Sequence, residues 1–215
     1  MLVNKLSYST KINLVPNGTK TFNRKIVLKN VAASTAYKTI LDIEKYKEYI
    51  PYCTDSKIIK KSPINMLPKQ GSLKVDFQKY TINFECDVEC KEENSISKCV
   101  AIIKEGHKES LHLFEYLNTT WKVSSVSNNQ NTKPLLLENS LAFKGLPLTS
   151  ENSANFNKNS QEQSCEVQLE LSFKFKSNLL QSVSILFGEA TMTVIMNAFK
   201  KRMLQVNSIN KRRFN

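Results

Sequence analysis

The sequence offers few groups for catalysis, and their spacing argues against most classes of enzyme. Glu85 and Asp87 lie two residues apart in an alternating stretch, so they share one face of a strand and point away from Phe84 and Val88. A carboxylate pair on the solvent side is not an enclosed acid and base. The sequence also lacks the G-x-S-x-G, P-loop and G-x-G-x-x-G motifs. We therefore expect no catalytic residue.

The histidines and cysteines do not have the spacing of a metal site. His107 and His112, the only histidines, lie in a connection rich in Lys and Glu, and Cys86 and Cys90 are four residues apart in a strand. The cysteines are odd in number and occur within segments of alternating apolar residues, unlike the disulfide framework of a small secreted domain. They are Cys53, Cys86, Cys90, Cys99 and Cys165. We expect them to be reduced and mostly buried, with no metal bound.

The formal net charge of +12 is concentrated at the two ends of the chain. No acidic residue precedes Asp42 and none follows Glu189. Residues 1–22 are basic, rich in Ser and Thr and free of acids, which is typical of a mitochondrial presequence, although a disordered basic tail has the same composition. Residues 208–215 form a second basic tail. No run of about 18 apolar residues is present to cross a bilayer.

A folding domain is expected between these tails, over residues 23–207. Its first elements are a short alternating strand at 24–31 and a helical stretch that Ser34 caps and Pro51 ends. Apolar alternation with a period of two then predicts a run of antiparallel strands. A polar stretch at 124–164, rich in Asn, Ser and Gln, interrupts this run as a loop insertion.

The C-terminal segment predicts one long helix. After Ser177, a candidate N-cap, about 30 residues continue without proline. Their apolar residues fall on two stripes, which is typical of a helix that packs on a sheet and also lines a cavity or contacts a membrane. The first stripe comprises Leu180, Val183, Phe187, Ala190, Val194 and Ala198, and the second comprises Leu179, Leu186, Ile195, Phe199 and Met203.

The order of the elements predicts an α+β fold, with a curved antiparallel sheet wrapped around the C-terminal helix. Such an arrangement leaves space for an internal hydrophobic cavity, the usual kind of site for an apolar ligand. The candidate lining residues are Val75, Phe77, Phe84, Val88 and Trp121 from the strands, and Leu180, Val183, Phe187, Ala190 and Val194 from the helix. Plain core packing is the alternative interpretation of the same residues.

Several local strings carry a resemblance to a known family. They are YKEYIPYC at 46–53, LFEYLNTTWKV at 113–123, CEVQLELSFKFKSNLL at 165–180 and AFKKRM at 198–203. With the order of elements, they make residues 24–206 similar to the mitochondrial coenzyme Q-binding proteins of the START (polyketide cyclase-like) superfamily. The resemblance implies a helix-grip fold, ubiquinone as the bound ligand, and no catalysis or catalytic cofactor.

The family also implies a location and a role. Its members are expected on the matrix side of the mitochondrial inner membrane, peripherally bound, where they support respiratory electron transport and coenzyme Q biosynthesis together with the complexes of those processes. The resemblance places Tyr52 near the cavity mouth, where its hydroxyl is suited to donate to a quinone carbonyl. An anchoring role in packing is the alternative for Tyr52.

Basic residues beside the last strand and in the final helix are candidates for contact with anionic lipid headgroups. They are Lys174, Lys176, Lys200, Lys201 and Arg202. Clustered basic residues near an anionic surface contribute about 1 kcal/mol each. A solvated basic face is the alternative.

Two other classes of function compete with a lipid chaperone. A cyclase-like enzyme would use the same cavity, but it needs an inward acid and base. A ribosome- or RNA-interacting protein would use the positive charge, but the charge is at the chain ends and no nucleic-acid motif accompanies it. We therefore expect no nucleic-acid partner.

Overall fold

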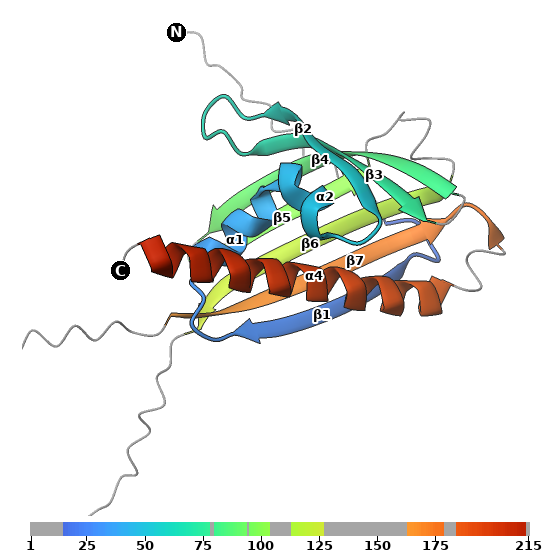
Figure 1. Cartoon of the computed structure of the whole chain (residues 1–215). Coiled ribbons are helices and arrows are strands. Elements are labelled where there is room, and N and C mark those ends of the chain that lie inside the picture. The colour runs from blue at the N-terminus through green and yellow to red at the C-terminus, as the bar shows by residue number, and fades with distance from the viewer. Residues whose placement is uncertain are drawn as a thin grey trace, which may run out of the picture.

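The fold is one seven-stranded antiparallel sheet with helices on its concave side (Figure 1). The computed structural model describes residues 15–77, 80–93, 95–103, 113–126, 163–178 and 184–213. The strands are β1 (Lys20–Leu28), β2 (Cys53–Lys61), β3 (Pro68–Phe77), β4 (Tyr80–Glu93), β5 (Ile96–Ile103), β6 (Phe114–Val126) and β7 (Ser164–Phe175). Their order in the sheet is β1-β7-β6-β5-β4-β3-β2. The predicted α+β fold with a curved antiparallel sheet is confirmed.

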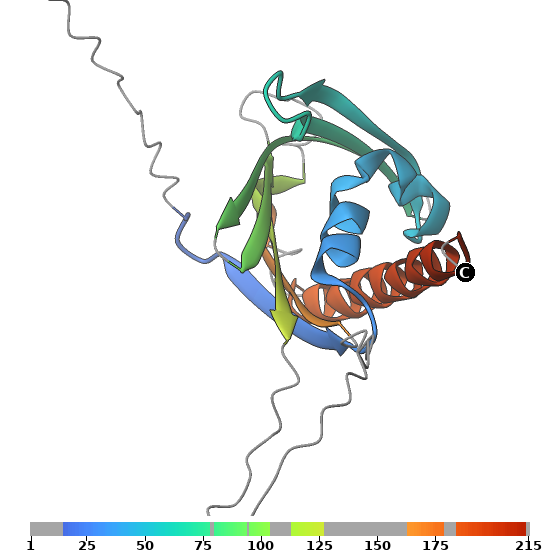
Figure 2. The same cartoon turned by 90° about the vertical axis from the view of Figure 1, so that its left-hand side faces the viewer.

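The strand register decides which side chains face the helices. Leu73 pairs with Phe84, Val75 with Ile82, and Val88 with Ala101, so alternate residues of β3, β4 and β5 share one face. A Cβ atom at Gly71, on this same face, would lie 3.4 Å from the Cδ1 atom of Ile43. This face is therefore the helix side, and Figure 2 shows the sheet curling around the helices on it.

Three helical segments lie between β1 and β2. They are α1 (Ala33–Leu41), η1 (Ile43–Lys45) and α2 (Tyr46–Tyr49). The N-cap of α1 is Ala32, so the prediction that Ser34 caps the helix is wrong. The backbone of Ala32 is extended, and its carbonyl already accepts from the amides of Thr35 and Ala36. The helix therefore starts two residues earlier than it would with Ser34 as its N-cap.

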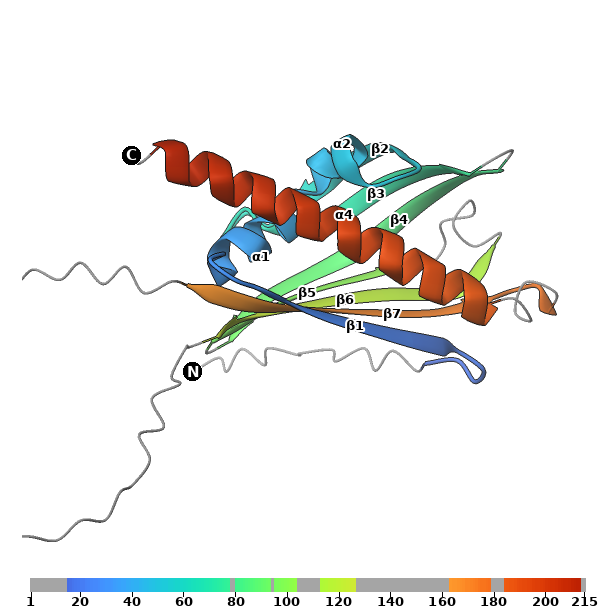
Figure 3. The ribbon, with the colours of Figure 1, turned by 60° about the horizontal axis from the view of Figure 1, so that its bottom comes forward.

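The long C-terminal helix, α4 (Ser184–Arg213), runs across the concave side beside β1 and β7 (Figures 1 and 3). Met192, Met196, Phe199 and Met203 are buried, and they recur at the spacing of one helical face. The amide of Asn207 donates to the carbonyl of Asn30 at 2.8 Å near the end of the helix.

The boundaries of the domain differ from the predicted ones. β1 begins at Lys20, inside the segment assigned to the N-terminal tail, and α4 continues to Arg213, through most of the predicted C-terminal tail. The polar insertion predicted at 124–164 begins later, since β6 continues to Val126. The rest of it, residues 127–162, lies outside the described residues.

Candidate functional site

The concave face of the sheet carries apolar side chains that are not fully buried. Six of them keep part of their surface accessible although they point towards the helices, and we call them the concave-face patch: Leu73, Val75, Ile82, Phe84, Ala101 and Leu117. In an ordinary core, inward side chains of central strands are fully packed. Half-buried residues at these positions therefore offer apolar surface to a ligand.

Of the predicted strand residues, Val75, Phe84, Val88 and Trp121 all lie on the concave face, so the prediction that they share one face is confirmed. Val75 and Phe84 belong to the patch, whereas Val88 and Trp121 are buried further along the same face. The backbone of Phe77 pairs with Tyr80 in the same register, and its side chain lies outside what the structure describes.

An aromatic cluster closes one end of the concave side. The ring of Phe199 on α4 lies 4.5 Å from that of Trp121, 5.1 Å from that of Tyr46 and 5.4 Å from that of Tyr49, between ring centroids. The hydroxyl of Tyr46 donates to the carbonyl of Ile40, and burial raises the pKa of this phenol far above its ordinary value. These rings fix α2 and α4 against the sheet.

A second aromatic cluster lies further along the concave face. The Phe114 ring is 5.9 Å from that of Phe84 and 4.8 Å from that of Phe175, while Phe173 stacks on Phe22 at 5.7 Å. Phe84, the half-buried ring of this cluster, also belongs to the concave-face patch. The patch is therefore continuous with a cluster of aromatic rings on the same face of the sheet.

The helical half of the predicted lining is partly wrong. Ala190 and Val194 are exposed, with Val194 at 39%. They lie on the side of the helix opposite the buried Met192, because residues two positions apart in an α-helix are rotated by about 200° around its axis. The interior stripe instead runs through Met192, Met196, Phe199 and Met203. Leu180, Val183 and the side chain of Phe187 lie outside the described residues.

Tyr52 lies in the corner between α2 and β2, with its side chain 56% exposed. Its backbone is left-handed, with φ of 66°, and its carbonyl accepts from the amide of Asp76 at 2.9 Å. Non-glycine residues adopt this conformation only at an energetic cost, so the surrounding turn fixes it. The side chain is therefore at the rim of the domain and not within the buried interior.

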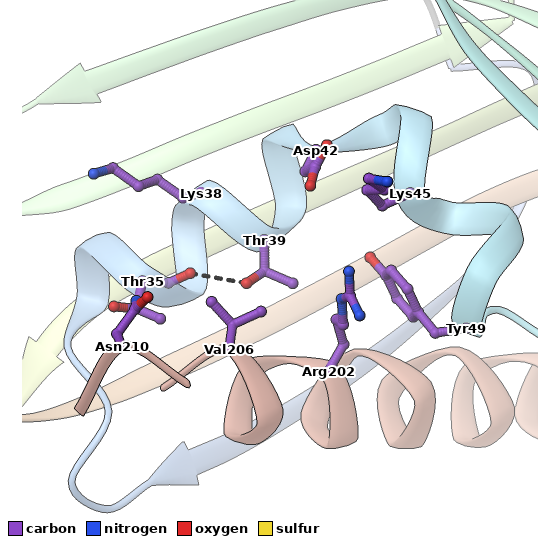
Figure 4. A pocket seen from close by; sticks show the side chains of 9 residues that line it. All are labelled: Thr35, Lys38, Thr39, Asp42, Lys45, Tyr49, Arg202, Val206 and Asn210. Carbon is purple, nitrogen blue, oxygen red and sulfur yellow. Dashed lines mark hydrogen bonds between the residues drawn. The ribbon is translucent and has the colours of Figure 1, made fainter. Parts of the chain in front are cut away.

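A separate pocket of about 150 Å³ lies between α1 and the C-terminal half of α4 (Figure 4). Its lining consists of Thr35, Lys38, Thr39, Asp42, Lys45, Tyr49, Arg202, Val206 and Asn210. Arg202 donates to Glu48 at 3.1 Å and lies 5.5 Å from the centroid of the Tyr49 ring. Lys45, which has the larger effect, and Arg202 together hold the pKa of Glu48 below its ordinary value. A lining of paired charges does not suit an isoprenoid tail.

The predicted basic residues do not form one surface. Lys174 bonds Glu115 at 2.8 Å, and the amide of Lys176 donates to Leu113 at the end of β7 where α4 starts. Lys200 and Lys201 are exposed. At a rise of 1.5 Å per residue, Lys200 lies about 24 Å along α4 from its first residue, Ser184. The expectation of a single basic end is therefore wrong, since Lys174 and Lys176 lie at the end of β7, whereas Lys200 and Lys201 lie in the C-terminal half of α4.

The five cysteines are free, as predicted. Cys90 and Cys99 face each other across β4 and β5 with 3.3 Å between sulfur atoms. Burial raises the pKa of Cys86, a concave-face residue, to about 12 and that of Cys165 to about 11. Both thiols are therefore protonated near neutral pH and are poor nucleophiles. In the described part of the chain, no three His, Cys, Asp or Glu side chains group as a metal site.

Two features of the site were not predicted. Met192 and Met196 on the inner face of α4 were absent from both predicted stripes, although Met is a common filler of irregular apolar space. Gly188 was not assigned a role, yet it lies directly against Phe22 of β1. A single glycine inside a helical pattern is the signal that indicates close approach of a neighbouring element.

Comparison with known proteins gives concordant matches. Residues 30–200 match a family model described as polyketide cyclase / dehydrase and lipid transport. A mitochondrial coenzyme Q-binding protein of Eremothecium gossypii is 31% identical over 192 residues, which cover 88% of this chain and 76% of that protein. Its counterpart in Saccharomyces cerevisiae is 30% identical over 173 residues, which cover 80% of this chain and 66% of that protein.

Solved structures agree on the fold. A START superfamily protein from Mycobacterium smegmatis has a TM-score of 0.56 at 16% identity, covering 86% of this chain and 98% of that one. An aromatase/cyclase, Zhui, from Streptomyces sp. R1128 has a TM-score of 0.55 at 7% identity, covering 87% and 94%. At these identities the likeness concerns the fold alone.

Proposed function

The chain belongs to the polyketide cyclase / dehydrase and lipid transport family and, within it, to the mitochondrial coenzyme Q-binding proteins, and on this premise we propose that it binds ubiquinone and acts as its chaperone. Its relatives are named for binding coenzyme Q, and the match extends over most of both chains. The role proposed is carriage of an isoprenoid quinone in support of respiratory electron transport and coenzyme Q biosynthesis.

The main structural support for this proposal is the concave-face patch. Its residues are apolar and half-buried, and they line the side of the sheet that faces α4. Covering apolar surface with an apolar ligand contributes about 25 cal/mol per Å². A polyisoprenoid tail supplies a long apolar surface of this kind, so affinity would come mainly from the tail. The buried rings of Trp121 and Phe114 would border the tail on the same face of the sheet.

The headgroup requires at least one polar contact to fix its orientation. Tyr52 remains our candidate donor, since it lies at the rim of the domain with an exposed side chain. Thr119 is a second candidate, because it lies on the concave face between Ala101 and Leu171 and is only half-buried. A Tyr52→Phe or Thr119→Val variant that discriminates less between quinone and quinol would identify the donor.

We place the protein at the matrix face of the mitochondrial inner membrane as a peripheral protein. The relatives are named mitochondrial, and the described helices include none long and apolar enough to span a bilayer. Anionic lipid would be its membrane partner, and enzymes of quinone synthesis or respiratory complexes would exchange quinone with it.

A cyclase-like enzyme is the competing function, because the fold is shared with an aromatase/cyclase. Such chemistry requires a convergent acid and base inside the site. The described inward positions of β4 and β5, from Ile82 to Cys90 and from Cys99 to Ile103, hold only apolar residues and cysteines. Asp87 is exposed and accepts from Gln70 on the outer face. We therefore propose binding without turnover.

Trp121, the only tryptophan, is an internal reporter for this proposal. It is buried on the concave face, where a quinone bound on the same face would quench its emission. Titration with a short-chain ubiquinone analogue should give saturable quenching with one site per chain. Quenching that rises linearly with the analogue, as for free tryptophan in solution, would contradict the proposal.

A further inference from the structure

The connection between β2 and β3 exposes large apolar side chains at the surface. Residues 62–67 form this connection, which we call the hairpin tip. Ile64 is 93% exposed and Met66 is 66% exposed, and the adjoining Ile59 of β2 is 50% exposed. Figure 1 shows the β2–β3 hairpin projecting at the end of the sheet. Exposed apolar residues that gather at one projecting point indicate an interaction surface.

The hairpin tip is an ordered turn. The amide of Ser62 donates to the carbonyl of Leu67 at 2.8 Å, and the amide of Met66 donates to the carbonyl of Ser62 at 3.0 Å. Met66 has a left-handed backbone, with φ of 58°. Ser62 itself is buried, and its hydroxyl accepts from the amide of Ile64 at 3.4 Å. The turn therefore holds Ile64 and Met66 outward in a fixed geometry, at little further cost in conformational entropy.

The chain segment that carries the hairpin tip has charge of one sign. From Ser56 to Val75 the sequence contains five lysines and no acidic residue. Lys57 is neutralised by Asp55 at 2.7 Å. Lys60, Lys61 and Lys69 are exposed on the two strand ends that flank the tip, and none of them is in an ion pair with another described residue. The tip is thus an apolar point flanked by lysines that have no ion-pair partner among the described residues, and only Lys69 lies close enough to an acidic residue of β4, Glu89, for the two charges to attract.

We propose that the hairpin tip docks this protein on an anionic lipid bilayer. Ile64 and Met66 enter the boundary between headgroups and acyl chains, and Lys60, Lys61 and Lys69 contact lipid phosphates. Apolar insertion combined with basic residues is the chemistry of peripheral membrane binding. A protein partner is less well matched, since a stable protein interface covers about 800 Å² on each side and a turn of six residues projects far less.

The proposal goes beyond quinone binding, since it names the surface by which the carrier meets the membrane. It rests on the proposed function only in the reason why the protein would bind a membrane, which is exchange of quinone. Docking itself needs no bound quinone, and it is measured without one. The concave-face patch and the hairpin tip share no residue, so a variant of one leaves the other intact.

The test is flotation of the full chain with phosphatidylcholine vesicles that do or do not contain cardiolipin. We expect binding to cardiolipin vesicles that weakens as salt is raised, because lysine contacts with headgroups are screened. Ile64→Asp with Met66→Asp should weaken binding at least tenfold, since two apolar side chains lose their burial. Lys60→Glu with Lys61→Glu should abolish the preference for cardiolipin.

The matched control is Val27→Asp. Val27 is 54% exposed on β1, so it has a similar apolar exposure, but it belongs to a strand, lies opposite Glu166, which pairs with Lys25, and does not project from a turn. The control should float as the wild type does. Equal unfolding midpoints and equal Trp121 emission show that every variant is folded.

Three results overturn the proposal: no flotation of the wild type, full flotation of the hairpin-tip variant, or equal loss in Val27→Asp. Quinone titration by Trp121 emission on the same preparations keeps the two proposals apart. Loss of flotation with unchanged quinone binding supports docking by the hairpin tip. If the wild type binds vesicles but no quinone, the proposed function is wrong and the docking proposal is still supported.

Discussion

Gly188 of α4 lies so close to Phe22 of β1 that a Cβ atom at position 188 would fall 2.2 Å from the Cε2 atom of the ring. The Phe22 ring is buried and stacks on Phe173, with 5.7 Å between centroids and 15° between planes. It therefore has little freedom to move aside. The pair sets how closely the N-terminal half of the long helix approaches the edge strand of the sheet.

Gly188→Ala should destabilise the protein by about 1 to 2 kcal/mol. Alanine favours a helix interior over glycine by about 1 kcal/mol, but forcing an extra carbon into a packed core costs about 1 to 3 kcal/mol, and the overlap at Phe22 is severe. Urea denaturation measures the change. Combining it with Phe22→Leu should restore part of the loss, whereas a single Gly188→Ala variant more stable than the wild type would show that the contact is loose.

Phe199→Ala should cost about 3 to 5 kcal/mol, the usual range for deletion of a buried aromatic ring. Phe199 is 2% exposed and contacts the rings of Tyr46, Tyr49 and Trp121. Val194→Ala on the same helix is the matched control, and it should change the free energy of unfolding by no more than about 0.5 kcal/mol because Val194 is on the solvent side. Similar losses in both variants would contradict the assigned inner face of α4.

The contrast between these two residues shows where sequence reasoning succeeded. Period-two alternation placed Phe84 and Val88 on one face of the sheet, because successive side chains of a strand can point only to two sides. The helix was harder, since apolar residues cover most of its circumference. Its inner face was decided by tertiary packing, of Gly188 against Phe22 of β1 and of Phe199 against Trp121 of β6 and the two tyrosines of α2. No local signal in the sequence ranks one apolar stripe above the other.

The surface features were predicted less well for the same reason. Lys174 and Lys200 were predicted to lie together because both adjoin apolar segments near the end of the chain, yet Lys174 is on β7 and Lys200 is in the C-terminal half of α4. Exposure of Ile64 and Met66 also depends on the three-dimensional turn, since alternation alone assigns isoleucine and methionine to the interior. Family resemblance could identify the fold and ligand class, but it named neither the inner stripe nor the hairpin tip.

Asp55 should titrate well below an ordinary aspartate. The ammonium of Lys57, at 2.7 Å, and that of Lys47, at 3.3 Å, lower the pKa of Asp55 to about 2. Because the folded pKa is depressed, the stabilisation by these pairs is complete above the unfolded value of about 3.9 and is lost as pH falls through about 2.

Carboxyl-carbon NMR checks this expectation directly. At pH 3 the Asp55 signal should remain that of the ionised form, whereas in Lys57→Met it should shift towards the protonated form. An Asp55 midpoint near 4 in the wild type would show that the two lysines do not hold the carboxylate in solution.

Mass spectrometry of organic extracts from natively purified protein tests the claim that the concave-face patch holds a quinone. Ala101→Trp would fill the concave side, because Ala101 is a small, half-buried residue between Val88 and Thr119. Val100→Trp is the matched control, since Val100 is also half-buried on β5 but points to the opposite face. We predict near-stoichiometric ubiquinone in the wild type and in Val100→Trp, and its loss in folded Ala101→Trp. Equal quinone content in both variants, or none in the wild type, would contradict the claim.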